Sequence, residues 1–505
     1  MAEAPTPGAP RRITVAEWLE GSVVVLITGA FALSAAHLTA WDRPVGDGWS
    51  RYLGNAIAIR DHAWSGYLRW RGPVHAWLCL MVMPLAGSLV RASQVVSFVA
   101  ATATLPITWA LGRRLGGRAT GLLALGVLAA WPDLPLFARF SSPYSLDAFL
   151  LVLATLLALD AGSFVRRNRI GSAIAAGVVL GIGVGTDLRF LPLTAAVATG
   201  AALAPRASSK RAAVLIPLLA LPLGYALVSS VPVSLYSLGE QVALQRDAAA
   251  ATVSECARRG PQPPLLADAF GACGRALVAL NLANATAAVC IPLTLLALLL
   301  MVGAWAAGRE ERWRAALLVL PVLTLVPSLA IIVVQHRYLV PVAPLVAVLV
   351  AAGLARGAAA LDARMPSIAP GFTLGAGLLV AGLGLAWGAS PTTLRARFVA
   401  HLRSGDRVVD AADAITAAWR PGDRVVDCAN GNLRERLYPI PVEERRARDD
   451  AARAQCNGVL GTPPTAPTWV LVRESSVPAG WNAVPLGGPG PDNAAGIVLL
   501  RGDGD

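Results

Sequence analysis

The feature that most constrains this chain is a series of apolar stretches, each close to the length of a helix that crosses a lipid bilayer. Such a helix needs roughly 20 consecutive apolar residues. The predicted spans are 21–40, 92–112, 119–137, 145–163, 170–186, 190–205, 212–232, 281–305, 315–334, 338–355 and 371–389. The predicted fold class is therefore an α-helical polytopic membrane protein with about eleven transmembrane helices.

Composition and charge agree with this fold class. The 505 residues are 55% hydrophobic and only 15% charged, whereas soluble domains carry roughly 25% charged residues. Residues 391–505 contain 14 basic and 14 acidic residues, so the whole net charge of +12 lies in residues 1–390. No basic patch interleaved with aromatic residues occurs outside the spans, so the sequence predicts no nucleic-acid partner.

The positions of the basic residues predict the orientation. Alternate connections carry two or three positive charges each: Arg11/Arg12, Arg113/Arg114/Arg118, Arg166/Arg167/Arg169, Arg206/Lys210/Arg211, Arg309/Arg312/Arg314 and Arg356/Arg364. Positively charged loops stay on the cytoplasmic side. We therefore expect a multi-pass protein of the cytoplasmic (inner) membrane, with residues 1–20 in the cytoplasm and the C-terminus outside.

Two further parts are predicted around the transmembrane domain of residues 21–390. Residues 391–505 read as a small extracytoplasmic (periplasmic) α/β domain, with helical spacing over 394–419 and short strands at 424–427, 469–473 and 497–500. Residues 41–91 form a first extracytoplasmic loop. Trp49, Tyr52, Leu53, Ala56 and Ile57 follow helical spacing there, which predicts an amphipathic helix at the membrane surface.

Four of the six cysteines fall in segments predicted to face the oxidising side. Cys256 and Cys273 share one outside loop, and Cys428 and Cys456 share the C-terminal domain. We expect two disulfides, because oxidising compartments favour them. Neither pair has CxxC spacing or a nearby histidine, so a zinc site is the weaker alternative.

Ionisable residues gather at the outer edge of the predicted bundle. Asp47 lies between two glycines just before the amphipathic helix, where a carboxylate could serve as base for a hydroxyl group. Charges at a membrane edge are functional candidates, and the others are Arg91, Arg139, Asp147, Asp187, Arg189, His336 and Arg337. Mutual pairing that closes the bundle is the alternative for Asp187 and Arg189. Arg91 and Arg337 lack a nearby carboxylate in sequence, which suits an anionic ligand.

The pattern resembles the GT-C glycosyltransferases, in the branch of protein O-mannosyltransferases (dolichyl-phosphate-mannose-protein mannosyltransferase-like) and lipid A aminoarabinose transferases. Segments 45–52 and 72–77 resemble the first outside loop of that branch, and Arg91 with 111–117 resembles its next span. Segment 139–147 resembles the second family loop, and 335–344 the late Arg-Tyr-Leu-Pro motif. Gly48 stands where the family usually has Glu, and Val74 and His75 interrupt its usual Pro-Pro.

The resemblance implies an inverting transferase that moves a sugar from a polyprenyl-phosphate donor to a hydroxyl acceptor. Asp47 and Asp147 would be the catalytic carboxylates. The implied residues for substrate or lipid phosphate are Tyr52, His75, Arg91, Arg139, Arg337 and Tyr338. No metal ligand set and no cofactor follow from the motifs, and a divalent metal ion stays open. The expected partners are the lipid-linked sugar, membrane lipids and an unidentified acceptor.

Two other classes of function fit the same residues. A lipid or anion transporter, or flippase, would use buried charges near the middle of broken helices. A non-catalytic assembly protein would only display the C-terminal domain. The predicted clustering of charge at one edge favours chemistry at the surface over transport.

Overall fold

The structure is a computed structural model, and it describes only part of the chain. The described residues are 14–38, 41, 49–62, 67, 71–131, 134–162, 169–187, 189–204, 207–231, 275–281, 309–324, 338–362, 407–428, 433, 437, 440–444, 456, 458–461, 466–472, 480–484 and 498–502. The predicted spans 281–305 and 371–389, the second half of 315–334, and the pair Cys256 and Cys273 lie largely or wholly outside them.

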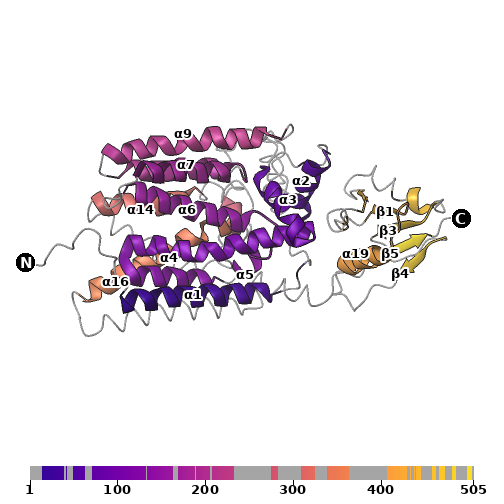
Figure 1. Cartoon of the computed structure of the whole chain (residues 1–505), viewed down its shortest axis with the longest axis horizontal. Helices are drawn as coiled ribbons and strands as arrows, with labels where there is room; N and C mark the ends of the chain where they lie inside the picture. The colour runs from indigo at the N-terminus through magenta and orange to yellow at the C-terminus, as the bar shows by residue number, and fades with distance from the viewer. Residues whose placement is uncertain are drawn as a thin grey trace, which may run out of the picture.

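A bundle of apolar helices forms the body of the molecule (Figure 1). Its helices are α1 (Val15–Ala36), α4 (Leu89–Ala129), α5 (Leu134–Phe137), α6 (Tyr144–Gly162), α7 (Arg169–Val184), α8 (Phe190–Ala202), α9 (Ala207–Ser229), α14 (Arg309–Leu323), the short 3₁₀ helix η3 (Val340–Val342) and α16 (Ala343–Asp362). Among the described residues, four helices are long and apolar enough to cross a membrane: α1, α4, α6 and the segment 340–359. The mostly helical membrane-protein fold predicted from the sequence is confirmed.

Helix α4 contains two of the predicted spans folded against each other. Gly116 and Gly117 leave helical geometry, with φ of Gly117 at 83°, a conformation that suits glycine. The two arms pack so closely that a Cβ at Gly121 would lie 2.9 Å from the carbonyl oxygen of Trp109. The second arm ends at Ala129 rather than at the predicted 137, because a proline at position 132 disfavours helical geometry in the residue before it. The next helix, α5, begins at Leu134.

Charged pairs identify one end of this bundle. Glu20, near the start of α1, contacts Arg118 at 3.3 Å and Arg113 at 3.5 Å, beside the turn of α4. Arg114 lies 3.8 Å from Asp160 at the end of α6. We call this the arginine end. Three of the predicted arginine-bearing connections therefore begin or turn at the same end of the bundle.

Two short helices lie at the opposite end, which we call the site end: α2 (Trp49–Arg60) and α3 (Val74–Ala86). Both are seen in Figure 1 away from α14 and the start of α1. The predicted amphipathic helix is α2, and Leu53, Ala56 and Ile57 are its buried face. Helix α3 rises only about 20 Å over its 13 residues, too short for the roughly 30 Å apolar layer.

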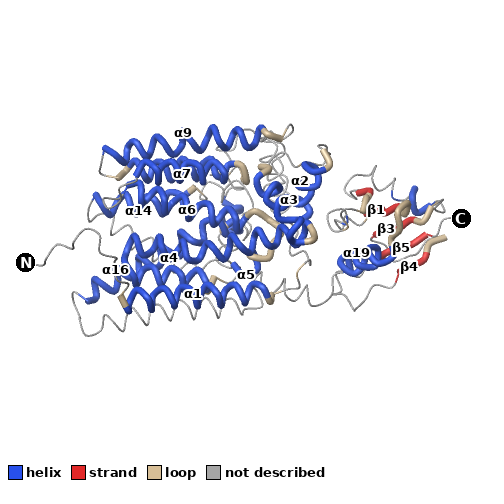
Figure 2. Tube along the Cα trace, in the orientation of Figure 1, coloured by secondary structure: helices blue, strands red, loops and turns tan. Residues whose placement is uncertain are grey.

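The C-terminal domain holds every strand among the described residues (Figure 2). Helix α19 (Arg407–Ala418) precedes β1 (Arg424–Asp427), β2 (Glu443–Glu444), β3 (Thr468–Val472), β4 (Asn482–Val484) and β5 (Val498–Gly502), in the sheet order β2-β1-β3-β5-β4. Strands β2, β1 and β3 are parallel, and β5 runs antiparallel to β3 and β4. The three predicted strands match β1, β3 and β5.

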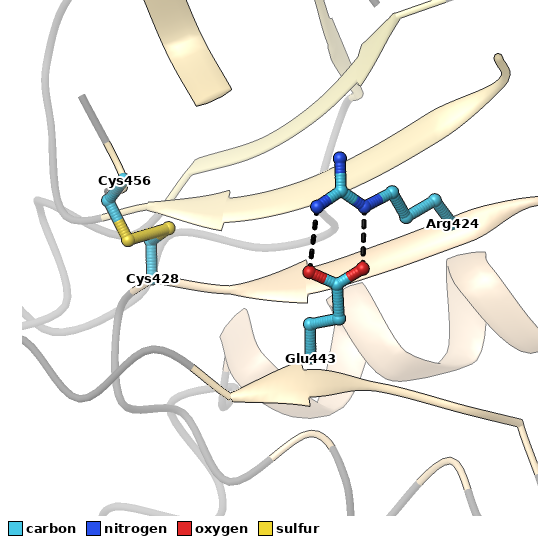
Figure 3. Close-up of a disulfide and its surroundings, with 4 residues drawn as sticks. All are labelled: Arg424, Cys428, Glu443 and Cys456. Carbon is cyan, nitrogen blue, oxygen red and sulfur yellow. Dashed lines mark hydrogen bonds and ion pairs between the residues drawn. A yellow bond between two sulfur atoms is a disulfide. The ribbon is translucent and has the colours of Figure 1, made fainter. Parts of the chain in front are cut away.

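Both faces of this sheet are covered. Val425 and Trp469 pack with α19 on one face, while Val426 and Val470 pack with the disulfide segment on the other. Cys428 and Cys456 form the predicted disulfide, with their Cα atoms 6.0 Å apart. Figure 3 shows it near the exposed pair of Arg424 and Glu443, which are joined at 2.6 and 2.8 Å.

Candidate functional site

A buried group of opposite charges lies at the site end of the bundle. Asp187, in the connection between α7 and α8, accepts hydrogen bonds from Nε and Nη2 of Arg189, each at 3.0 Å, and from the Arg189 backbone N–H at 2.9 Å. Arg71, which precedes α3, forms an ion pair with the same carboxylate. Two arginines, one before α3 and one after α7, therefore contact the carboxylate of Asp187, which is fully buried.

Asp147 belongs to the same group. It lies in the first turn of α6, and its Oδ2 accepts a hydrogen bond from Nη2 of Arg189 at 3.1 Å. Its Oδ1 accepts one from the hydroxyl of Thr186 at 2.8 Å. Arg189 thus bridges the two carboxylates. We call Arg71, Asp147, Asp187 and Arg189 the charge cluster; its formal charges sum to zero.

Backbone pairing holds the segment before α3 against the connection after α7. Arg71 and Asp187 form an isolated antiparallel bridge, and the N–H of Val74 donates to the carbonyl of Gly185 at 3.0 Å. The approach requires a glycine, since a Cβ at Gly185 would lie 2.6 Å from Cγ2 of Val74. The ion pair of Arg71 is therefore fixed by the backbone as well as by charge.

Three tyrosines surround the charge cluster. The hydroxyl of Tyr52, on α2, donates to the hydroxyl of Tyr144, on α6, at 2.9 Å. The guanidinium of Arg71 lies 5.0 Å from the Tyr52 ring centre, and that of Arg189 lies 5.0 and 5.6 Å from the rings of Tyr144 and Tyr338. Such cation–π contacts stabilise buried guanidinium groups. Segments from five parts of the chain converge here.

Electrostatics keep the Asp187 carboxylate ionised. Burial alone would raise the pKa of Asp187, but the guanidinium groups of Arg189 and Arg71 outweigh it and hold this pKa at about 2. One donor remains uncommitted: within the described residues, Nη1 of Arg189 is buried and has no hydrogen-bond partner. A buried donor of this kind is costly unless a ligand or water accepts from it. Arg189 therefore keeps one N–H group that can donate to an oxygen of a ligand.

Three other predicted site residues are described by the structure, and each has a different environment. His75, on α3, packs edge-on against Tyr52 with ring centres 6.0 Å apart, and burial lowers its pKa to about 4. Arg139 donates to the last carbonyls of α1, at 2.7 Å from Ala36 O, and stacks on Trp41. Arg91 is exposed in the first turn of α4.

Asp47 and Arg337 lie outside the described residues. The structure thus brings Asp147, Tyr52 and Tyr338 together, with His75 beside them. The contacts described for the charge cluster do not include Arg91 or Arg139.

Sequence reasoning missed part of this site. Arg71 was not a candidate at all, although it stands directly before the Gly72-Pro73 turn that begins α3. Mutual pairing was the alternative for Asp187 and Arg189, and the two do pair. Their links to Arg71 and Asp147 join segments far apart in sequence. Among the described residues, no group of three His, Cys, Asp or Glu side chains could hold a metal ion.

Comparisons with known proteins bear on this end of the molecule. Residues 70–235 match the family described as dolichyl-phosphate-mannose-protein mannosyltransferase, and this stretch contains the whole charge cluster. The structure is similar to that of ArnT from Cupriavidus metallidurans bound to undecaprenyl phosphate, with a TM-score of 0.61. The alignment covers 97% of this chain and 98% of that chain at 13% identity.

The resemblance to the GT-C glycosyltransferases is confirmed. A second GT-C neighbour is the archaeal oligosaccharyltransferase AglB from Archaeoglobus fulgidus, in complex with an inhibitory peptide and a dolichol-phosphate. It has a TM-score of 0.57 and 13% identity, over 90% of this chain and 70% of that one. No curated protein sequence gives a significant match. At these identities the structural likeness establishes the GT-C fold, and the chemistry has to be argued from the site.

Proposed function

We propose that the protein is an inverting glycosyltransferase that moves a sugar from a polyprenyl-phosphate donor to a hydroxyl acceptor. The observation that carries the proposal is the buried charge cluster with an uncommitted Arg189 donor, inside the stretch that matches the mannosyltransferase family. Solved structures of the same fold hold undecaprenyl phosphate or dolichol-phosphate. Both ligands carry the phosphate group that the proposed reaction would release.

In the proposed reaction the acceptor oxygen attacks the anomeric carbon from the face opposite the phosphate. The bond between that carbon and the phosphate oxygen breaks, and its electron pair stays on the phosphate. Asp47 takes the proton of the acceptor hydroxyl, because a neutral hydroxyl is a poor nucleophile. Negative charge therefore grows on the leaving phosphate while the proton moves to the carboxylate.

Arg189 is suited to stabilise that growing charge. Its Nη1 would donate to a phosphate oxygen, while Nε and Nη2 keep the side chain fixed on Asp187 and Asp147. A donor fixed in advance stabilises a transition state without the cost of reorganisation. Arg71, with 12% of its side chain exposed, would add a second positive charge. Arg91, Arg139, His75 and Arg337 remain proposed contacts for the donor.

Asp147 would orient the acceptor hydroxyl. Thr186 and Arg189 each hold one of its oxygens, and each oxygen retains a lone pair for an acceptor hydroxyl. It would orient the acceptor toward Asp47. Tyr52 and Tyr338, with their aromatic faces on the two guanidinium groups, would keep the arginines in place around the phosphate.

We further propose that the site end faces outward from the cytoplasmic membrane. The arginine end would then be cytoplasmic, in accord with the preference of positive loops for that side. The C-terminal domain lies at the site end in Figure 1, and its disulfide of Cys428 and Cys456 is typical of an oxidising compartment. Acceptor and donor would meet at the outer surface.

The variant Asp47→Asn tests the proposed base. It should abolish sugar transfer while purified protein keeps the thermal stability of the wild type, because asparagine has the size of aspartate and differs in its charge. Asp42→Asn, in the same loop, is the matched control and should keep its activity. Full activity of Asp47→Asn would overturn the assignment of the base.

A further inference from the structure

A pocket lies at the arginine end of the bundle, far from the charge cluster. Its volume is roughly 210 Å³. The residues that line it come from the turn of α4, from α14 and from α16: Leu115, Gly116, Thr120, Arg314, Leu318, Ala352, Ala355, Arg356 and Ala359. Segments separated by about half of the chain thus enclose one space.

The lining combines positive charge with apolar walls. Arg314 and Arg356 are half-buried, and among the described lining residues none is acidic. Leucine and alanine side chains make up most of the rest, and the alanines of α16 leave the space open. Two guanidinium groups in an apolar setting suit a phosphate ester, because arginine binds phosphate through paired N–H donors.

Size and location narrow the ligand class. The volume is below the roughly 300–1,000 Å³ of pockets that hold whole small molecules, so it fits a phosphate group and its immediate substituents. The turn of α4 and the end of α16 lie where the bundle would meet a membrane boundary, and lipid phosphates lie at that depth. Basic pockets between transmembrane helices bind anionic lipid head groups.

We propose that this pocket binds the phosphate of an anionic membrane phospholipid, with the acyl chains remaining in the bilayer. The site is separate from the charge cluster and needs neither donor nor acceptor. It would tie α14 and α16 to the turn of α4 at the membrane boundary. Its existence does not depend on the proposed glycosyl transfer.

Native mass spectrometry of the full-length protein in detergent tests the proposal. Phosphatidylglycerol should remain bound in preference to phosphatidylcholine. The double variant Arg314→Gln/Arg356→Gln should bind phosphatidylglycerol about tenfold or more weakly, since it removes both guanidinium groups that would donate to the phosphate inside the pocket. The matched control is Arg312→Gln, on the same helix but outside the pocket lining, and it should bind like the wild type.

A pocket-filling variant separates lipid binding from loss of the fold. Ala355→Leu keeps both arginines and should weaken phosphatidylglycerol binding to a similar degree. If the double variant does not fold, lipid binding by Ala355→Leu tests the proposal alone. Inorganic phosphate should compete only at high concentration, because it lacks the apolar part of the ligand. Undiminished lipid binding in Ala355→Leu and the folded double variant, or binding of inorganic phosphate with no preference between the two lipids, would overturn the proposal.

Discussion

Replacing Asp187 by Asn should destabilise the site end of the bundle more than the loss of an exposed ion pair destabilises the protein. The substitution keeps the size of the side chain and one oxygen, which can still accept from the backbone N–H and Nε of Arg189. It removes the charge that faces both Arg189 and Arg71. The cluster would carry one more positive charge than in the wild type, around a position that is fully buried.

The expected cost follows from burial. Removing one partner of a buried ion pair typically costs roughly 3–5 kcal/mol, because the other charge is left uncompensated. The retained oxygen of Asn places Asp187→Asn near the lower limit, at about 3 kcal/mol. Arg118→Gln is the matched control at the other end of the bundle. Its side chain is 46% exposed and its partner Glu20 keeps Arg113 and Trp109, so it should cost less than about 1 kcal/mol.

Thermal unfolding of the purified protein in detergent measures both effects. Asp187→Asn should lower the unfolding temperature clearly, and Arg118→Gln hardly at all. Adding Arg71→Gln to Asp187→Asn should restore part of the loss, because one uncompensated charge is removed with its partner. Equal unfolding temperatures for Asp187→Asn and Arg118→Gln would refute the idea that buried charge pairing holds the site together.

Three further outcomes are expected. Tyr52→Phe removes the buried hydrogen bond to Tyr144 and should cost about 1–2 kcal/mol in an unfolding assay; no measurable change would contradict that contact. His75 has its pKa lowered to about 4 by burial, so the folded state binds fewer protons than the unfolded chain between pH 6.5 and 4. Stability should therefore fall by up to about 3 kcal/mol as pH drops through that range, and His75→Gln should flatten this dependence. Replacing Cys428 and Cys456 by Ser should destabilise the C-terminal domain by about 2–4 kcal/mol, as seen by proteolysis of the domain.

Much of the fold could be predicted because it depends on local patterns. Apolar length marked the spans, and an arginine-rich glycine turn separated the two arms of α4. Short apolar segments bounded by Pro, Gly and Asp predicted the strands of the C-terminal domain. One local signal was overlooked: Thr14 and Glu17 form a capping box, which starts α1 at Val15 rather than at residue 21.

The composition of the site was harder to predict, since it depends on contacts between distant segments. Asp147 and Tyr52 were candidates by resemblance, and both lie in or beside the cluster. The meeting of Arg71 with Asp187 depends on backbone pairing between the loop before α3 and the connection after α7. Neither segment carries a pattern that specifies the other. Arg139 is fully buried, yet the residues around it in sequence do not indicate that it donates to the last carbonyls of α1.

Turnover of a lipid-linked sugar is the measurement that tests the central claim most directly. Purified full-length protein would be incubated with a panel of polyprenyl-phosphate sugars and hydroxyl acceptors, and the released polyprenyl phosphate would be quantified. We expect release with at least one donor, formation of a product inverted at the anomeric carbon, and loss of both with Asp47→Asn. Intact donor in every reaction, or donor carried across a vesicle membrane without cleavage, would contradict the account.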